Sequence, residues 1–102
     1  MKNKNKSMYS IRNKKKAKHP FVIVGYDKTK FKAMGLTHSK RSGHRNNLKL
    51  NKNPNHKEDK DAYLKRQIIN DFKFNFSKAF KNYELSNSDI DLIIEYLNKK
   101  KK

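Results

Sequence analysis

The residues best suited to chemistry lie in one short segment, residues 37–45, with the sequence Thr-His-Ser-Lys-Arg-Ser-Gly-His-Arg. The segment combines hydroxyls, imidazoles and cationic side chains, and it contains no carboxylate. Hydroxyl, Lys and Arg side chains bind the oxygens of a phosphodiester, and Arg can do so with two parallel hydrogen bonds. The segment therefore predicts a site that contacts a phosphate backbone.

The same residue types would also support cleavage of RNA. Metal-free cleavage needs a group that takes the 2′-hydroxyl proton, a group that protonates the leaving oxygen, and a cation over the charge on phosphorus. Histidine titrates near neutral pH and can transfer these protons. Phosphate contacts are the commonest use of such residues, however, so composition alone favours binding without chemistry.

His19 is the other candidate for chemistry, because it follows a run of lysines and directly precedes a hydrophobic run. If that run pairs with residues 30–37 in a hairpin whose register brings it near Thr37, His19 meets residues 37–40 at one end of the sheet. The alternative is an exposed histidine without a function. The predicted nucleic-acid-binding residues are Lys14, Lys15, Lys16, Lys18, His38, Arg41, His44 and Arg45.

Two hydrophobic runs must position these residues. Residues 21–25 are continuously apolar up to a glycine and predict a central strand. Residues 30–37 predict a second strand, which makes a hairpin with the first. Residues 38–46 have no hydrophobic side chain and predict a loop, and residues 47–51 predict a short strand.

The second half of the chain gives weaker local signals. Residues 62–71 fit either a strand or a short helix. Residues 72–76 alternate phenylalanine with polar residues, which favours extended structure. Residues 77–83, by contrast, space their aromatic residues at helical intervals and predict a helix.

The end of the chain predicts an amphipathic helix over about residues 87–99. Ser86 and Ser88 are candidate N-caps, and Asp89 and Asp91 lie where the helix dipole favours negative charge. The apolar residues that share one face of this helix are Ile90, Ile93, Ile94 and Leu97.

Most aromatic residues are expected in the core, because the chain has few hydrophobic residues with which to build one. Tyr9 and Tyr26 are the expected exceptions, since both adjoin basic segments. They are candidates for stacking on nucleobases.

The positive charge is concentrated in the first half of the chain. The 102 residues include Lys+Arg 27 and Asp+Glu 9, a formal net charge of +18. Residues 1–57 hold 17 Lys or Arg and one acid, a net +16, whereas residues 58–102 hold 10 and 8, a net +2. Like charges gathered in one half of the chain repel one another in a compact state. This indicates a polyanionic partner such as RNA, DNA or an acidic protein.

Composition also excludes several classes of protein. The sequence contains no cysteine, which excludes disulfides, a thiol nucleophile and Cys-ligated zinc. The spacing of its histidines and glycines fits no metalloprotease, P-loop or dinucleotide motif, so we expect no metal and no cofactor. Without a membrane-length apolar stretch or a secretory signal, a soluble, cytoplasmic protein without a membrane partner is expected.

These elements predict one small α+β domain, mainly β, over residues 19–102. We expect a small SH3-like barrel or a bent antiparallel sheet with a C-terminal amphipathic helix packed on it. Residues 1–18 are expected to form a basic, partly disordered arm, with a short strand at residues 9–12.

Three short motifs resemble a known family. Residues 19–24 (HPFVIV) resemble the Arg-Pro-Val-Val-Val-Ile strand of MazF/PemK-like toxins, and residues 36–40 (LTHSK) resemble a later strand end, including the Thr/Ser/Lys cluster of ToxN relatives. Residues 85–97 are similar to the start of the family's last helix. The chain departs from the family at His19, which replaces an arginine, and in its first strand, which is missing or reduced to residues 8–18.

The resemblance implies an SH3-like interferase fold that cuts single-stranded RNA without metal. It implies that Thr37 contacts phosphate and that Ser39 and Lys40 stabilise transition-state charge. With His19 in the place of the arginine, either the imidazole acts as acid or base, or the protein binds RNA without cutting it. It also implies an antitoxin partner, RNA or acidic protein, and leaves a homodimer open.

The sequence is consistent with two main candidate functions and a third, less favoured one. The first is a metal-independent endoribonuclease toxin, and the second is a non-catalytic nucleic-acid-binding protein that is ribosome-associated or encoded by a phage or plasmid. The third is a phage inhibitor that binds an acidic surface of a host protein.

Overall fold

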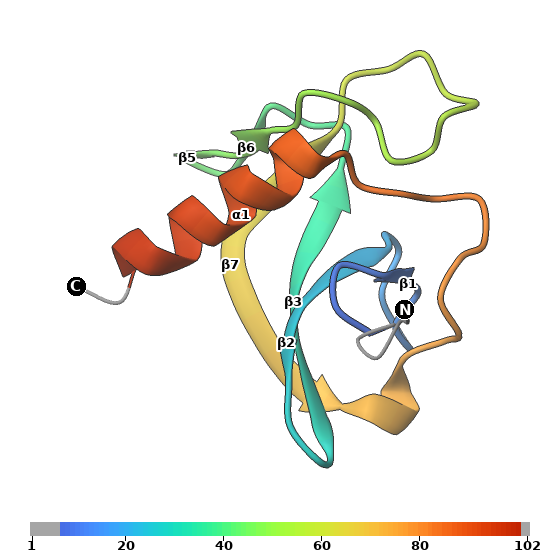
Figure 1. Cartoon of the computed structure of the whole chain (residues 1–102). Helices are drawn as coiled ribbons and strands as arrows, with labels where there is room; N and C mark the ends of the chain where they lie inside the picture. Colours follow the sequence, from blue (N-terminus) through green and yellow to red (C-terminus); the bar gives the residue numbers. More distant parts are fainter. Residues whose placement is uncertain (1–6, 101–102) are drawn as a thin grey trace.

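The computed structural model describes residues 7–100, and the first part of the expected arm, residues 1–6, lies outside the described residues. Seven strands, one short 3-10 helix and one α-helix make up the described part of the chain (Figure 1). In chain order they are β1 Ile11–Arg12, β2 Phe21–Tyr26, β3 Lys30–Thr37, β4 Arg41–Ser42, β5 Arg45–Asn46, β6 Leu48–Lys49, β7 Tyr63–Phe72, η1 Lys73–Asn75 and α1 Asn87–Lys100.

Five of the strands form one antiparallel sheet in the order β1-β2-β3-β7-β6. The sheet is strongly bent, and α1 lies across one side of it (Figure 1). A single antiparallel bridge between Lys14 and Phe76 brings the segment after β1 against the segment after β7. The protein is therefore a small α+β domain, mainly β, with a bent antiparallel sheet and a C-terminal helix, as the sequence predicts.

The β2–β3 hairpin has the expected position and fixes the geometry of the candidate site. Phe21 pairs with Gly35, and the amide of Leu36 donates to the carbonyl of Pro20 at 2.9 Å. This pairing carries the ladder one step beyond β2, so that His19 lies at the level of Thr37. The register that the sequence could only assume is therefore present.

Strand β7 resolves the ambiguity of residues 62–71 in favour of a strand. It pairs with β3 along most of its length and with β6 near its start, for example Met34 with Ile68 and Leu48 with Leu64. Pairing on both edges satisfies its backbone groups in a way that a short helix at this position would not.

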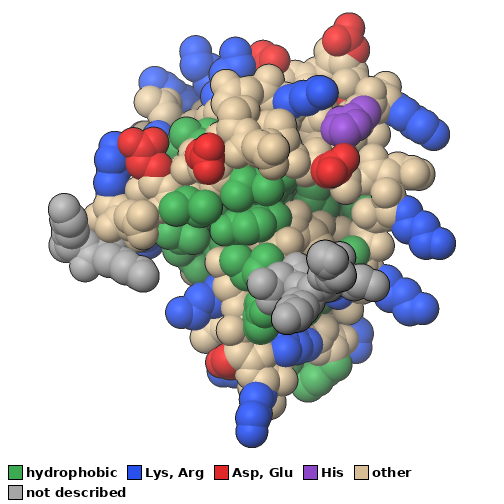
Figure 2. Space-filling view, in the orientation of Figure 1, with side chains coloured by type: hydrophobic (Ala, Val, Ile, Leu, Met, Phe, Trp, Pro, Cys, Tyr) green, Lys and Arg blue, Asp and Glu red, His purple; other side chains and the backbone are tan. Residues whose placement is uncertain are grey.

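Each face of the sheet has its own apolar cluster. The larger cluster lies under α1 and includes Val22, Met34, Leu64 and Ile93, all fully buried. The smaller cluster lies on the other face and consists of Ile23, Phe31, Ala33 and Phe76, with Phe21 and Ile69 packed against it. Figure 2 shows hydrophobic side chains gathered at the centre of the α1 side, with Lys and Arg side chains around its edge.

Helix α1 begins where the sequence predicts, and Ser86 is its cap. The amide of Asp89 donates to Ser86 Oγ at 3.2 Å. The Asp89 carboxylate is fully buried and accepts hydrogen bonds from the amides of Asn51 and Lys52, at 2.6 and 3.1 Å. Asp89 therefore joins the helix to the segment after β6, a role that the dipole argument did not predict.

Three local predictions are wrong. Residues 77–83 form no helix, because their backbone pairs with the segment around β1: the amides of Ser77 and Phe80 donate to the carbonyls of Asn13 and Ile11, at 2.9 and 2.8 Å. The expected loop at residues 38–46 contains the β4–β5 hairpin. Of the expected extended segment 72–76, residues 73–75 form η1.

The described part of the expected N-terminal arm packs on the domain. Ile11 is buried in the larger cluster, and β1 pairs with β2 through Ile11 and Val22. The structured domain therefore extends further towards the N-terminus than residue 19. Within residues 7–100, no helix has the length and apolar composition to cross a membrane.

Candidate nucleic-acid interface

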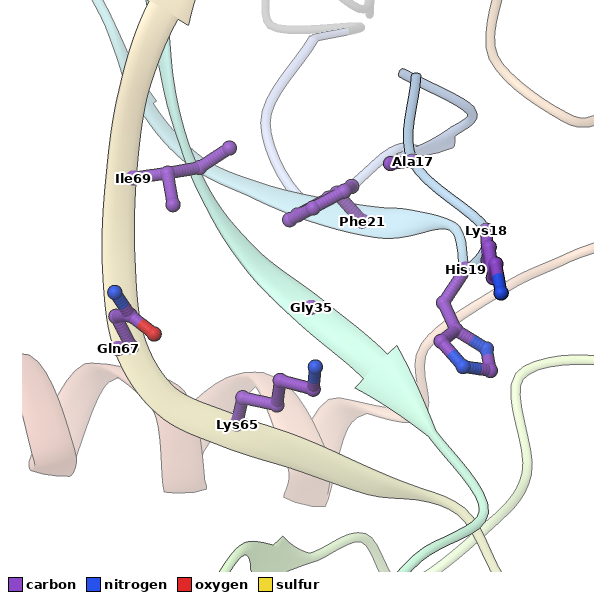
Figure 3. Close-up of a pocket in the computed structure, with 8 residues that line it drawn as sticks. All are labelled: Ala17, Lys18, His19, Phe21, Gly35, Lys65, Gln67 and Ile69. Carbon is purple, nitrogen blue, oxygen red and sulfur yellow. The ribbon is translucent and has the colours of Figure 1, made fainter. Parts of the chain in front are cut away.

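His19 stands between two pockets and lines both of them. The first pocket, which we call the sheet groove, has a volume of about 170 Å³ and opens on the face of the sheet that carries the smaller cluster (Figure 3). The residues that line the sheet groove are Ala17, Lys18, His19, Phe21, Gly35, Lys65, Gln67 and Ile69.

The sheet groove is lined by cations without a carboxylate. Lys18 and His19 lie on one side, and Lys65 extends from β7 towards the strand that carries Gly35 (Figure 3). Phe21 supplies an aromatic ring and Gln67 an amide on the same surface. Cations with an aromatic ring and an amide are the groups that contact the phosphates and bases of a single strand.

Gly35 is what keeps the floor of the sheet groove open. A Cβ at this position would lie 3.2 Å from Cδ of Lys65 and 3.7 Å from Cε2 of Phe21. A contact of 3.2 Å is tighter than ordinary van der Waals packing, so any larger residue would push the Lys65 side chain aside. The glycine therefore lets Lys65 lie flat over β3.

The second pocket, which we call the histidine pocket, has a volume of about 90 Å³ and contains two imidazoles. Its lining residues are His19, Pro20, Leu36, Thr37, His38, Asn53, Glu58, Ala62 and Tyr83. The expected meeting of His19 with residues 37–40 is present here for Thr37 and His38, which line the same pocket. Ser39 and Lys40 lie on the turn that follows and are not among the lining residues.

His38 is paired with Glu58, which the sequence did not indicate. The two side chains meet at 3.0 Å between Nε2 and Oε1, and Asn53 donates to the same carboxylate oxygen at 3.1 Å. The hydrogen bonds from His38 and then Asn53 hold the pKa of Glu58 below its usual value. Because an ionised carboxylate can only accept, Nε2 of His38 carries the proton and Nδ1 is its unprotonated atom when the ring is neutral.

Thr37 has a structural role in the turn. Its side chain is nearly buried, with 6% exposed, and Oγ1 accepts a hydrogen bond from the amide of Ser39 at 3.1 Å. This bond holds the start of the turn that presents His38. A phosphate contact by Thr37 would have to share the hydroxyl with this bond.

The predicted lysines after β1 have different surroundings. Lys14 is in an ion pair with Asp71 at 3.1 Å and ties this segment to β7. Lys15 extends over the ring of Phe74, at 5.9 Å from its centroid, and Lys16 is exposed. Of these lysines, Lys18 is the one that lines the sheet groove.

The predicted arginines lie on the β4–β5 hairpin and are not among the residues that line the two pockets. Arg41 donates through Nε to Asn46 at 3.1 Å, and Arg45 donates through Nη1 to the carbonyl of Arg66 at 3.0 Å. The turn between the strands contains Gly43 at φ 64°, where a glycine is favoured, and the exposed His44. These hydrogen bonds order the hairpin and leave its tip in solvent.

Sequence reasoning missed the residues of β7 and Glu58. Lys65 and Gln67 share a face by strand alternation, a signal that becomes usable only once residues 62–71 are assigned as a strand. Glu58 is 20 residues from His38 in the sequence, and no local pattern joins the two.

No family model, no curated protein and no solved structure matches this chain. Among the described residues, no group of three or more His, Asp or Glu side chains is placed to hold a metal ion.

Proposed function

We propose that this protein binds single-stranded RNA and that the sheet groove holds part of its backbone. The observation that carries the proposal is the lining of the sheet groove, where Lys18, His19 and Lys65 share one surface with Phe21 and no carboxylate is present. The net charge of +18 supports a polyanionic ligand. The Phe21 ring in the groove, which can contact an unpaired base, favours one strand over a duplex.

Fluorescence anisotropy with labelled oligonucleotides tests this proposal. Single-stranded RNA should bind more tightly than a duplex of the same sequence, and a matched DNA strand separates RNA from general nucleic-acid binding. Lys65→Glu should weaken binding strongly. Lys99→Glu, which places the same charge on α1 outside the groove lining, should have a much smaller effect. Equal affinity of both variants, or no binding by the wild type, would refute the proposal.

A second candidate function is cleavage of the bound RNA, and the histidine pocket is the observation that favours it. Two imidazoles line this pocket, and one of them is held by a carboxylate. His38, with Nε2–H donated to Glu58, can accept a proton at Nδ1, and a protonated His19 can supply one.

The reaction would proceed through the 2′-hydroxyl of the substrate. His38 takes the 2′-hydroxyl proton, the 2′-oxygen forms a bond to phosphorus, and the bond from phosphorus to the 5′-oxygen breaks. His19 gives its proton to the departing 5′-oxygen. The products are a 2′,3′-cyclic phosphate and a 5′-hydroxyl, which are the ends that a toxin of the resembled type would leave.

Incubation of single-stranded RNA with the protein in EDTA tests this candidate. Fragments with cyclic phosphate and 5′-hydroxyl ends are expected, and His19→Ala or His38→Ala should each abolish them. Thr37→Val removes both the acceptor of the Ser39 amide and any phosphate contact by Thr37, so it tests whether cleavage needs this hydroxyl at all. Intact RNA at high protein concentration would eliminate cleavage and leave the binding proposal standing. The antitoxin partner that the family resemblance implies stays a prediction in either case.

A further inference from the structure

Two phenylalanines form an exposed stacked pair at the end of β7, which we call the phenylalanine platform. Phe72 is 42% and Phe74 71% exposed, and their rings are stacked at 5.2 Å between centroids and 6° between planes. The sequence predicted both in the core, because the chain has few large apolar residues to spare. Exposing two of them keeps a large apolar surface in water without any benefit to packing.

The backbone around the phenylalanine platform is fixed on two sides. Lys73 lies between the two phenylalanines in the sequence, and its amide donates to the carbonyl of Thr29 at 2.8 Å. The carbonyl of Asn75 accepts from the amide of Lys15 at 2.8 Å. Asp71 accepts from the amide of Phe72 at 2.7 Å. The rings are therefore presented by an ordered turn that is tied to the β2–β3 hairpin and to the segment after β1.

Lysines flank the platform on both sides. Nζ of Lys30 lies 4.9 Å from the centroid of Phe72, and Nζ of Lys15 lies 5.9 Å from that of Phe74. Among the ion pairs of residues 7–100, none involves Lys15 or Lys30.

The acids near the platform are already engaged. Asp27 accepts from the amides of Thr29 and Lys30, at 2.9 and 2.8 Å, and Asp71 pairs with Lys14. Asp27 still attracts the ammonium of Lys30 at longer range. Because neither Lys15 nor Lys30 is held in an ion pair among the described residues, both ammonium groups can contact an anionic ligand.

We propose that the phenylalanine platform stacks on the bases of single-stranded RNA while Lys15 and Lys30 contact the adjacent phosphates. The inference rests on the proposed function and adds a second contact surface to it. Exposed aromatic faces beside cations are the arrangement by which proteins bind single strands without sequence preference. A lysine over an exposed ring makes a weaker contact than a stacked base, so an incoming base displaces the ammonium, which then meets the phosphate.

The charges around the rings decide between this ligand and a protein partner. An apolar protein surface that covered the platform would bury the ammonium groups of Lys15 and Lys30 with no ion-pair partner for either among the described residues, which is costly. A polynucleotide supplies an apolar base and an anion together.

The test compares four proteins on two ligands. Wild type, Phe74→Ala, Phe74→Leu and Phe74→Trp are titrated with 2′-O-methyl oligouridine, which resists cleavage, and with an abasic strand of the same length. Phe74→Ala and Phe74→Leu should each weaken binding to the oligouridine by about tenfold and leave binding to the abasic strand unchanged. Phe74→Trp should keep the affinity, and its fluorescence should be quenched by the bases, since the native chain contains no tryptophan.

Ile94→Ala is the matched control, because Ile94 is 40% exposed on α1 and should not affect binding. Unchanged affinity in Phe74→Ala, retained affinity in Phe74→Leu, or an equal loss on the abasic strand would overturn base stacking. These results would leave the sheet groove untouched, whereas absence of binding by the wild type refutes the proposed function and this inference together. Because Phe74 is exposed, its substitution should not unfold the protein, so a loss of affinity would report on the contact with the ligand. Thermal melting of each variant checks that the fold is retained.

Discussion

The double variant Lys18→Gln and Lys65→Gln should make RNA binding less sensitive to salt. Each of these lysines lines the sheet groove. In the proposed mode of binding, each contacts one phosphate. Binding to a single strand loses about 0.7 in the slope of log K against log salt for each phosphate contact that is removed. Two contacts therefore correspond to a slope that is shallower by about 1.4, which over a fourfold rise in salt is about a sevenfold smaller loss of affinity.

The control for this prediction removes the same charge elsewhere. Lys49 and Lys99 lie in exposed ion pairs with Asp61 and Glu95, at 3.7 and 3.8 Å, and neither lysine lines the groove. Anisotropy titrations at several salt concentrations give the slope for the wild type, the groove variant and the variant with Lys49→Gln and Lys99→Gln. An equal change of slope in both variants would show that the whole positive surface binds RNA and would refute a specific groove.

Three further predictions concern the scaffold of the site. Asp89→Ala should lower the free energy of unfolding by about 2–4 kcal/mol, because the amides of Asn51 and Lys52 lose their buried, charged acceptor. The exposed Asp91→Ala should change it by less than about 0.5 kcal/mol in the same urea titrations. Gly35→Ala should displace the Lys65 side chain and weaken RNA binding. Its free energy of unfolding should stay the same or rise by up to about 0.5 kcal/mol. Unchanged affinity for RNA in this variant would contradict the role given to Gly35. The pKa of Asp71 is held below its usual value by hydrogen bonds from Asn75 and Phe72 and by Lys14, so its stabilising contribution should be complete above about pH 4 and disappear as the pH falls through the lowered pKa. Urea midpoints measured in acid should therefore fall less steeply in Asp71→Asn than in the wild type, and identical curves would contradict this.

The hairpin and the last helix could be predicted because their signals are local. Residues 21–26 are continuously apolar up to a glycine and an aromatic residue, and residues 30–37 follow after a turn, so that the two strands pair without information from the rest of the chain. The helix over residues 87–100 has its cap at Ser86 and its apolar face within its own sequence.

The errors lie where distant segments decide the structure. Residues 77–83 have helical spacing, but their backbone hydrogen bonds go to the segment around β1. Phe80 and Tyr83 pack against the larger cluster, whereas Phe76 lies in the smaller one. Tertiary pairing overrides local propensity in such short segments.

The candidate site shows the same division. The meeting of His19 with Thr37 and His38 followed from a hairpin register, but Glu58 and Lys65 enter through a long loop and a strand that local pattern left ambiguous. The exposure of Phe74 could not be predicted from composition, which placed it in the core. Tyr26 was expected at the surface and is 44% exposed, whereas Tyr9 packs against the larger cluster.

Backbone-amide chemical-shift mapping of the protein during titration with a non-cleavable single-stranded RNA tests the central claim most directly. The account predicts that the largest shifts fall on residues 17–19, on Gly35 and on residues 65–69, which surround the sheet groove. Shifts confined to the tip of the β4–β5 hairpin or to α1, with the groove residues unmoved, would contradict it.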